Sequence, residues 1–93
     1  MILPYSVYIL QSKKDLLLYH GFTTNIEQRL KDHNNGGTKS TSKRMPLQLI
    51  FCEYYLCRKD AMRRERYFKT TQGKRMLKLM LRNTLQEIRY PVN

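Results

Sequence analysis

Two apolar runs near the start of the chain, joined by a short polar stretch, constrain the fold more than any other feature. Residues 5–11 read Tyr-Ser-Val-Tyr-Ile-Leu-Gln and are rich in the aromatic and β-branched residues that strands favour. Residues 16–22 form the second apolar run, and the intervening Lys13-Lys14-Asp15 is polar and turn-like. Two short strands separated in this way predict a β-hairpin.

A helix is predicted after the hairpin, because Thr24-Asn25-Ile26-Glu27 matches the capping-box pattern. In that pattern the Thr24 hydroxyl accepts from the Glu27 amide, and the Glu27 side chain reaches back to the Thr24 amide. Ile26 and Leu30 give the helix an apolar stripe. The run Asn34-Asn35-Gly36-Gly37 predicts its end, since glycine readily adopts the left-handed conformation found there.

The strongest strand pattern of the chain comes after a polar, basic loop. Residues 38–45 form that loop, and Pro46 precedes the apolar run of residues 47–55. Because this run is nearly continuous rather than alternating, it predicts a central strand covered on both faces.

Helices are predicted for the rest of the chain. Residues 60–69 and 74–82 have helical patterns, with Gly73 interrupting between them. A second capping-box match, residues 84–87, predicts the start of a last short helix. The principal order β-β-α-β-α-α predicts a small α+β domain with helices flanking a short sheet.

The charge balance points to a polyanionic partner. Eighteen Lys and Arg stand against seven Asp and Glu, a formal net charge of +11 on 93 residues. Phosphates neutralised by such a chain release bound counterions, which favours nucleic acid; a membrane surface or an acidic protein is the alternative. The length fits one domain, residues 1–93, and is too short for two.

The two cysteines, Cys52 and Cys57, are too few for a disulfide framework, and neither histidine lies at zinc-ligand spacing from them. We therefore expect two reduced thiols. The N-terminus lacks a basic segment followed by a long apolar run, and no stretch approaches membrane-spanning length. These features predict a soluble cytoplasmic protein with no membrane partner.

A set of residues in a fixed order carries the functional interpretation. The set comprises Val7-Tyr8-Ile9, Tyr19-His20-Gly21, Arg29, His33, and Ala61, Glu65, Phe68 and Lys69 in the pattern Ala-x-x-x-Glu-x-x-Phe-Lys. This order resembles the GIY-YIG nuclease family, in particular its small stand-alone, single-domain members. The resemblance covers the core from about Tyr5 to about Leu81 and implies the family's small α+β fold, a three-stranded antiparallel sheet flanked by helices.

The resemblance also implies a role for each matching residue. Tyr8 is the general base for the attacking water or positions that water, and Tyr19 hydrogen-bonds the phosphate or the water. Gly21 leaves room for the phosphate, because a side chain there would block its approach. Arg29 binds the scissile phosphate through its planar guanidinium. His33, one helical turn from Arg29, orients Tyr8 or shuttles a proton.

Glu65 corresponds to the family's metal ligand, and the cofactor implied is a divalent metal, Mg²⁺ or Mn²⁺. A phenol has a pKa near 10, so Tyr8 needs a nearby cation to ionise at neutral pH, and Arg29 and the metal are the expected sources. Basic side chains around these residues are expected to contact the nucleic-acid backbone. They are Lys39, Lys43, Arg44, Lys69, Lys74, Arg75 and Lys78.

The sequence departs from the family pattern at three points. Val7 replaces the first glycine, His20 replaces the isoleucine of the second motif, and Asn83 is the first asparagine after Glu65. As a strand residue next to Tyr19, His20 is expected on the opposite face of the sheet. No attached targeting domain is predicted, so target choice is expected to depend on a protein partner, a homodimer or substrate shape.

Two functional hypotheses follow. The first is a metal-dependent endonuclease that hydrolyses phosphodiester bonds, of DNA rather than RNA and of branched, nicked or distorted structures. The second is a non-catalytic basic module that binds nucleic acid through the same fold, since a fold does not fix a function.

Overall fold

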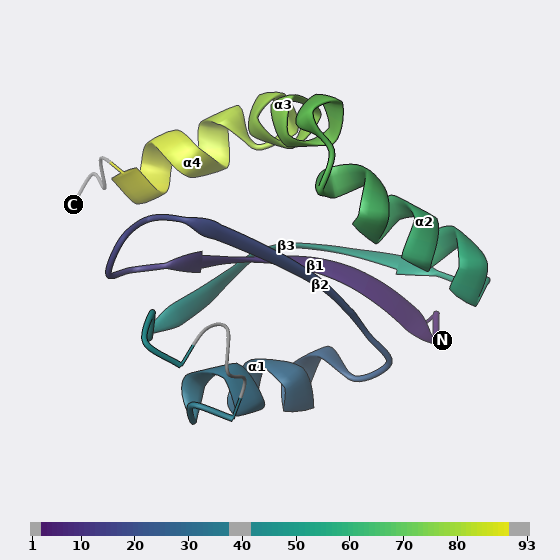
Figure 1. Cartoon of the computed structure of the whole chain (residues 1–93), viewed down its shortest axis with the longest axis horizontal. Helices are drawn as coiled ribbons and strands as arrows, with labels where there is room; N and C mark the ends of the chain where they lie inside the picture. The colour runs from purple at the N-terminus through teal and green to yellow at the C-terminus, as the bar shows by residue number, and fades with distance from the viewer. Residues whose placement is uncertain (1–2, 38–41, 90–93) are drawn as a thin grey trace.

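The computed structural model describes residues 3–37 and 42–89, which form a three-stranded antiparallel sheet between two helical layers (Figure 1). The elements in chain order are β1 (Tyr5–Ser12), β2 (Leu18–Thr23), α1 (Ile26–Asn34), β3 (Leu47–Tyr55), α2 (Arg58–Phe68), α3 (Thr71–Met80) and α4 (Arg82–Arg89). In Figure 1, α1 lies on one face of the sheet, and α2, α3 and α4 lie on the other. The predicted α+β class and order are confirmed, with α4 completing the series.

The hairpin prediction is correct, but the prediction of the central strand is wrong. The strands lie in the order β2-β1-β3, so β1 is central and β3 is an edge strand. Every residue of β1 after Tyr5 is buried, whereas β3 is mostly half-buried. A continuous apolar run requires cover on both faces, and helices can give an edge strand that cover. The pattern therefore could not show which strand has two neighbours.

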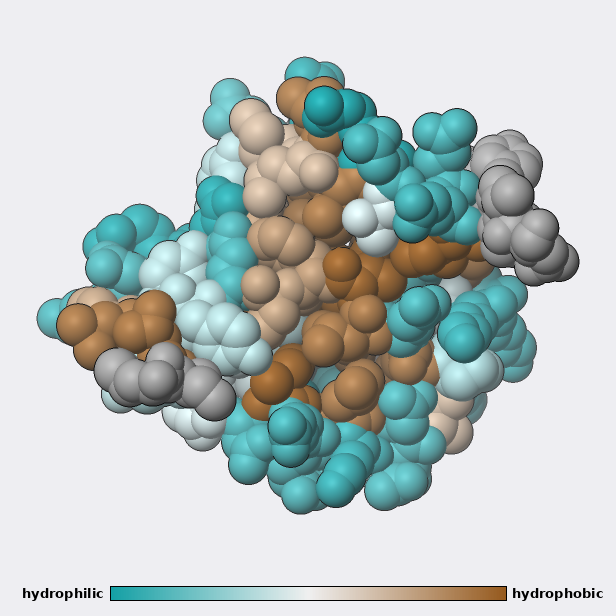
Figure 2. Space-filling model, turned by 180° about the vertical axis from the view of Figure 1, so that it is seen from behind, coloured by the Kyte–Doolittle hydropathy of each residue, from teal (hydrophilic) through white to brown (hydrophobic). Residues whose placement is uncertain are grey.

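Alternate residues of β1 divide the hydrophobic core into two parts. Val7 and Ile9 pack with residues of α2, α3 and α4, and Tyr8 and Leu10 pack with residues on the α1 side. Seen from behind, hydrophobic side chains form a band across the middle of the molecule with polar side chains above and below (Figure 2). Both helical layers are thus held by one strand.

Helix α1 begins one residue later than the capping-box pattern predicts. Its N-cap is Asn25, whose side chain accepts from the Gln28 amide at 3.1 Å. The Thr23 hydroxyl oxygen accepts from the Asn25 amide at 3.1 Å, which fixes the turn into the helix. The predicted end is correct, since Asn35 is the C-cap and Gly36 has φ of +75°.

Gly73 does not interrupt a helix but lies inside the first turn of α3. The N-cap of α3 is Thr70, whose hydroxyl oxygen accepts from the Gly73 amide at 3.0 Å. A Cβ at Gly73 would overlap the carbonyl oxygen of Tyr67 at the end of α2. The glycine therefore allows the two helices to join closely. The second capping-box prediction is also wrong, because α4 begins before Thr84, at Arg82.

An ion pair between α2 and β3 holds α2 on the sheet. The Arg64 guanidinium donates from Nε and Nη2 to the two carboxylate oxygens of Glu53, both at 3.0 Å. The same guanidinium lies 4.5 Å from the centre of the Phe68 ring. Because a two-bond arginine–carboxylate contact fixes orientation as well as distance, it sets the position of the next residue, Glu65.

We predict that Gly73→Ala destabilises the fold, because the new methyl group would overlap backbone rather than a movable side chain. Overpacking of this kind costs about 2 kcal/mol, which corresponds to roughly 10 °C in Tm for a chain of this size. Thermal unfolding followed by circular dichroism measures the change. The exposed neighbour Gln72→Ala is the matched control, and an equal Tm for both variants would contradict the role given to Gly73.

Candidate active site

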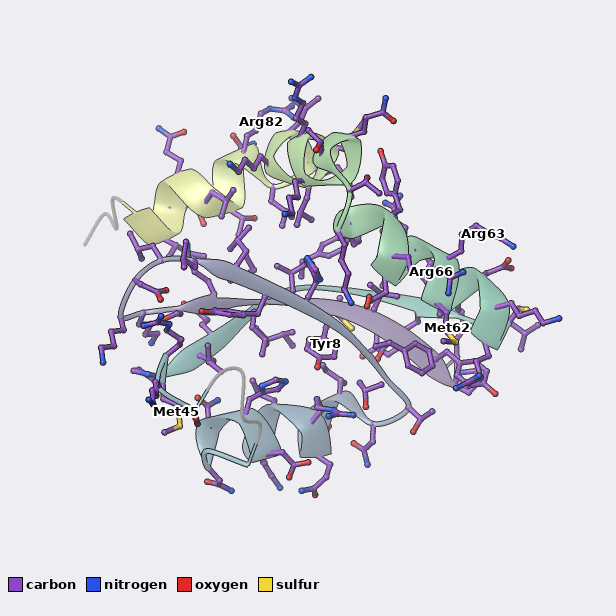
Figure 3. The ribbon with its side chains drawn as sticks, in the orientation of Figure 1. Tyr8, Met45, Met62, Arg63, Arg66 and Arg82 are labelled. Atoms are coloured by element: carbon purple, nitrogen blue, oxygen red, sulfur yellow. The ribbon has the colours of Figure 1, made fainter. Side chains whose placement is uncertain are left out.

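Tyr8 and Gly21 form the centre of the candidate site. They are paired across β1 and β2, and a Cβ at Gly21 would overlap the hydroxyl and ring carbons of Tyr8. The tip of the Tyr8 ring therefore lies over Gly21, in space that only glycine leaves open. Figure 3 shows Tyr8 extending from the sheet toward α1. Gly21 therefore gives the Tyr8 ring its place. The role of Gly21 in leaving room for a phosphate stays a prediction.

His33 holds the Tyr8 hydroxyl from the end of α1. The distance from Tyr8 Oη to His33 Nε2 is 3.1 Å, and both side chains are buried. Burial lowers the pKa of His33, and the nearby Arg29 charge lowers it further against the opposing effect of Asp32. The imidazole is therefore neutral at pH 7, and a neutral imidazole has one nitrogen that can accept a proton.

The surroundings of Tyr8 do not lower its pKa, although the sequence led us to expect that a nearby cation would favour ionisation. Burial raises the pKa of Tyr8, the charge of Arg29 lowers it, and the charge of Glu65 raises it again, with a net increase. The predicted field of Arg29 is present but does not outweigh desolvation. In the structure Tyr8 is thus a phenol at pH 7. Both charges act on it although α1 and α2 lie on opposite faces of the sheet.

Glu65 is mostly buried on the inward face of α2, with its side chain 13% exposed. Its Oε1 accepts from Lys69 Nζ at 2.8 Å, whereas its Oε2 is buried and has no hydrogen-bond partner among the residues that the structure describes. A buried carboxylate oxygen without a partner suits a hard cation, which prefers oxygen ligands. No group of three or more His, Cys, Asp or Glu side chains gathers within residues 3–37 and 42–89. A metal at Glu65 would therefore rely on water and phosphate for its other ligands.

Two residues of β2 lie on opposite sides of the strand beside Gly21. Tyr19 is half-buried and packs with the Tyr8 cluster on the α1 side. His20, as expected, lies on the other face, where Glu65, Lys69 and Lys74 influence its pKa; burial is the largest effect and lowers it. The strand thus presents Tyr19 to one layer and His20 to the other.

The predicted nucleic-acid contacts come from several parts of the chain. Lys43 is exposed, and the Arg44 guanidinium pairs with Asp15 at 3.1 Å beside the hairpin turn. Lys69 pairs with Glu65, and Lys74 lies on α3. Lys39 lies outside the described residues.

Sequence reasoning did not predict the Glu53–Arg64 pair, which positions Glu65. Glu53 and Arg64 are 11 residues apart on different elements, so no local spacing indicates that they meet. Figure 3 shows that Arg63 and Arg66, the neighbouring arginines on α2, project away from the sheet instead.

The GIY-YIG catalytic domain family matches residues 4–78 of the chain. A UPF0213 protein of Clostridium perfringens is 40% identical over 85 residues, which cover 90% of each protein. A UPF0213 protein of Bacillus licheniformis is 46% identical over 64 residues, which cover 68% of this chain and 66% of the relative. The chain therefore belongs to the GIY-YIG family.

Within that family the similarity narrows to the small UPF0213 proteins. The solution NMR structure of a UPF0213 protein from Bacillus halodurans matches with a TM-score of 0.52 and 34% identity. The match covers 82% of this chain and 83% of the other. Among the described residues, no helix is long and apolar enough to cross a membrane.

We predict that the two histidines make the fold less stable in mild acid. Each has a folded-state pKa below the ordinary 6.5, so below that pH the unfolded chain binds more protons than the folded chain. Stability is greatest above 6.5 and falls as the pH drops from there toward the folded-state pKa values. Urea unfolding between about pH 7.5 and about pH 5.5 measures this slope.

The double variant His20→Gln, His33→Gln is the control, because the chain has only two histidines. Its free energy of unfolding should change less over the same pH range. An unchanged slope would show that the histidines do not cause the dependence.

Proposed function

We propose that the protein is a metal-dependent endonuclease that hydrolyses phosphodiester bonds in nucleic acid, with DNA as the preferred substrate. The observation that carries this proposal is the contact of the Tyr8 hydroxyl with His33, in a position where the charges of both Arg29 and Glu65 act on it. These groups come from three separate elements, β1, α1 and α2, which lie far apart in the sequence. A basic chain of net charge +11 supports a polyanionic substrate.

Arg29 binds the scissile phosphate in this proposal. Its guanidinium can donate to two phosphate oxygens and offset the negative charge that grows in the transition state. The half-buried Tyr19 hydroxyl lies on the same face of the sheet and donates to the phosphate or to the attacking water.

Tyr8 and His33 together activate the water. Because Tyr8 is protonated at pH 7, it cannot act as a base unless its own proton leaves. As the water oxygen bonds to phosphorus, the bond between phosphorus and the leaving oxygen breaks, a water proton moves to Tyr8 Oη and the Tyr8 proton moves to His33 Nε2. The leaving oxygen takes up a proton from solvent, and His33 then releases its extra proton to solvent. The lowered pKa of His33 keeps its imidazole neutral beforehand, and this step uses the form in which Nδ1 carries the proton and Nε2 accepts.

Glu65 holds the divalent metal, with the partnerless Oε2 as the first oxygen ligand. When bound, Mg²⁺ or Mn²⁺ would offset the negative charge that develops on the leaving oxygen and on the oxygens bonded to phosphorus. Lys69 pairs with Oε1 in the structure. In this proposal its ammonium group binds the phosphate backbone once the carboxylate holds the cation. Target choice by a protein partner, a homodimer or substrate shape remains part of this proposal.

A non-catalytic module that binds nucleic acid is the second candidate. The 2.8 Å contact between Lys69 and Glu65 favours it, because that ammonium group already neutralises the proposed metal ligand. Both candidates bind nucleic acid with a strong dependence on salt, so binding alone does not separate them.

Cleavage of labelled DNA and RNA structures with Mg²⁺ or Mn²⁺ separates the two candidates. We expect Tyr8→Phe and Glu65→Ala each to reduce the rate of cleavage by roughly 100-fold or more, because each removes a group that acts in the transition state. Affinity for the same substrates without metal should change little, since neither group is a main source of positive charge.

Tyr54→Phe and Glu87→Gln are the matched controls, since both residues are exposed and lie outside the candidate site. Equal residual cleavage in wild type, Tyr8→Phe and Glu65→Ala would indicate a contaminating nuclease and refute the proposed endonuclease activity. Salt-dependent binding without any cleavage would support the second candidate.

A further inference from the structure

A groove lies on the far side of β2 from Tyr8. It has a volume of about 610 Å³, within the range of ligand pockets, and runs between the β1–β2 hairpin and the helices α3 and α4. In Figure 1 these helices lie along the hairpin on the face opposite α1. No family motif accounts for this groove.

Apolar side chains form its wall and its mouth. Leu18, Leu77 and Leu85 line it from the strand and both helices, and Leu16 and Leu17 stand at the hairpin turn, 39% and 57% exposed. Leu16 has φ of +64°, a conformation that costs energy for a residue with a side chain. Its amide donates to the Ser12 carbonyl at 2.8 Å, so the turn itself holds the leucine in place.

Two polar atoms in the wall of the groove have no hydrogen-bond partner in another residue of the described part of the chain. Gln11 is buried, and its Nε2 donates to the Leu16 carbonyl at 3.2 Å, whereas its Oε1 is buried without a partner. His20 Nδ1 is also buried and makes no hydrogen bond to another described residue. Because buried polar atoms are almost always satisfied, two such atoms in one groove indicate a ligand that brings hydrogen-bonding groups.

The rim of the groove is basic. Lys74, Lys78 and Arg82 line it at intervals of four residues along α3 and into α4, and no acidic residue lines it. Lys74 also influences the pKa of His20, as do Glu65 and Lys69, so His20 lies within electrostatic range of both the groove rim and the proposed metal ligand.

A nucleotide matches all three features. Its base has apolar faces and a polar edge, and its phosphate carries the negative charge that the rim lacks. An acidic amphipathic peptide would satisfy the leucines and the cations but would leave Gln11 Oε1 and His20 Nδ1 unmatched if only apolar side chains entered the groove.

We propose that this groove binds an unpaired nucleotide of the nucleic-acid substrate, with its base against Leu77 and Leu85 and its phosphates on Lys74, Lys78 and Arg82. The inference rests on the proposed function and extends it to a substrate class. Gln11 Oε1 can only accept, so it takes an N–H of the base edge. A substrate that already has an unpaired nucleotide avoids the cost of breaking a base pair, which makes structure rather than sequence the main basis of selection.

Fluorescence anisotropy with labelled DNA, in EDTA so that no cleavage occurs, tests the proposal. Wild type should bind a duplex with a single-stranded flap about tenfold more tightly than the fully paired duplex of the same sequence, as expected for one seated base. Leu17→Asp, which places a charge at the exposed mouth of the groove, and the double variant Lys74→Ala, Lys78→Ala should each lose most of this preference. Circular dichroism checks that these surface variants stay folded.

The double variant Lys59→Ala, Arg63→Ala is the matched control, because it removes the same charge from exposed positions on α2. It should weaken binding of both DNAs equally and keep the preference for the flap. A preference that survives in both groove variants, or that the control also loses, would overturn the inference. Displacement of the flap DNA by an acidic peptide but not by a mononucleotide would also overturn it and assign the groove to a protein partner.

The proposed nuclease function and the proposed nucleotide groove would be contradicted by different results. If wild type binds no nucleic acid at all, the proposed function fails and the groove inference fails with it. If wild type and both groove variants bind and cleave paired and flapped DNA alike, the nuclease stands and only the groove inference is wrong.

Discussion

The arrangement of this protein depends on a three-stranded sheet whose central strand, β1, is buried on both faces. The neighbouring strand, β2, forms one edge of this sheet. Tyr8 faces α1, while the neighbouring Val7 and Ile9 face α2, α3 and α4. Charged groups of the two helical layers can interact through the sheet, because the apolar side chains around Tyr8 leave little water to screen them. The effects of Arg29 and Glu65 on Tyr8 show that they do so here.

The other features of the site follow from that constraint. Gly21 on β2 leaves space for the Tyr8 ring, and His33 fixes its hydroxyl from the end of α1. On the other face, the Glu53–Arg64 pair fixes α2, so that Glu65 points inward. The same narrow strand carries His20 on its second face, which links the site to the groove under α3 and α4. In this account the two faces of the edge strand β2 therefore contribute to two binding surfaces, the candidate active site and the groove.

The sequence was most informative where a function restricts local structure. The apolar runs and the capping-box pattern predicted the hairpin and the first helix, and the family resemblance implied that His33 lies close to Tyr8. It was less informative where two local patterns compete, as at Thr24 and Asn25, since both are good N-caps and Asn25 forms the cap. Strand order, the close approach at Gly73 and the Glu53–Arg64 pair depend on contacts between distant segments, which no spacing along the chain encodes.

The central claim is that residues from both faces of the sheet form one metal-dependent site at the β2 edge, and Mn²⁺ tests it directly. The paramagnetic ion broadens NMR signals near it, so a titration of the ¹⁵N-labelled protein maps where it binds. We predict that the amide signals of Glu65, Tyr8 and Gly21 broaden first, and that Glu65→Gln removes this effect. Broadening centred on other acidic residues, such as Glu27 or Asp32, with Tyr8 and Gly21 unaffected, would contradict the account.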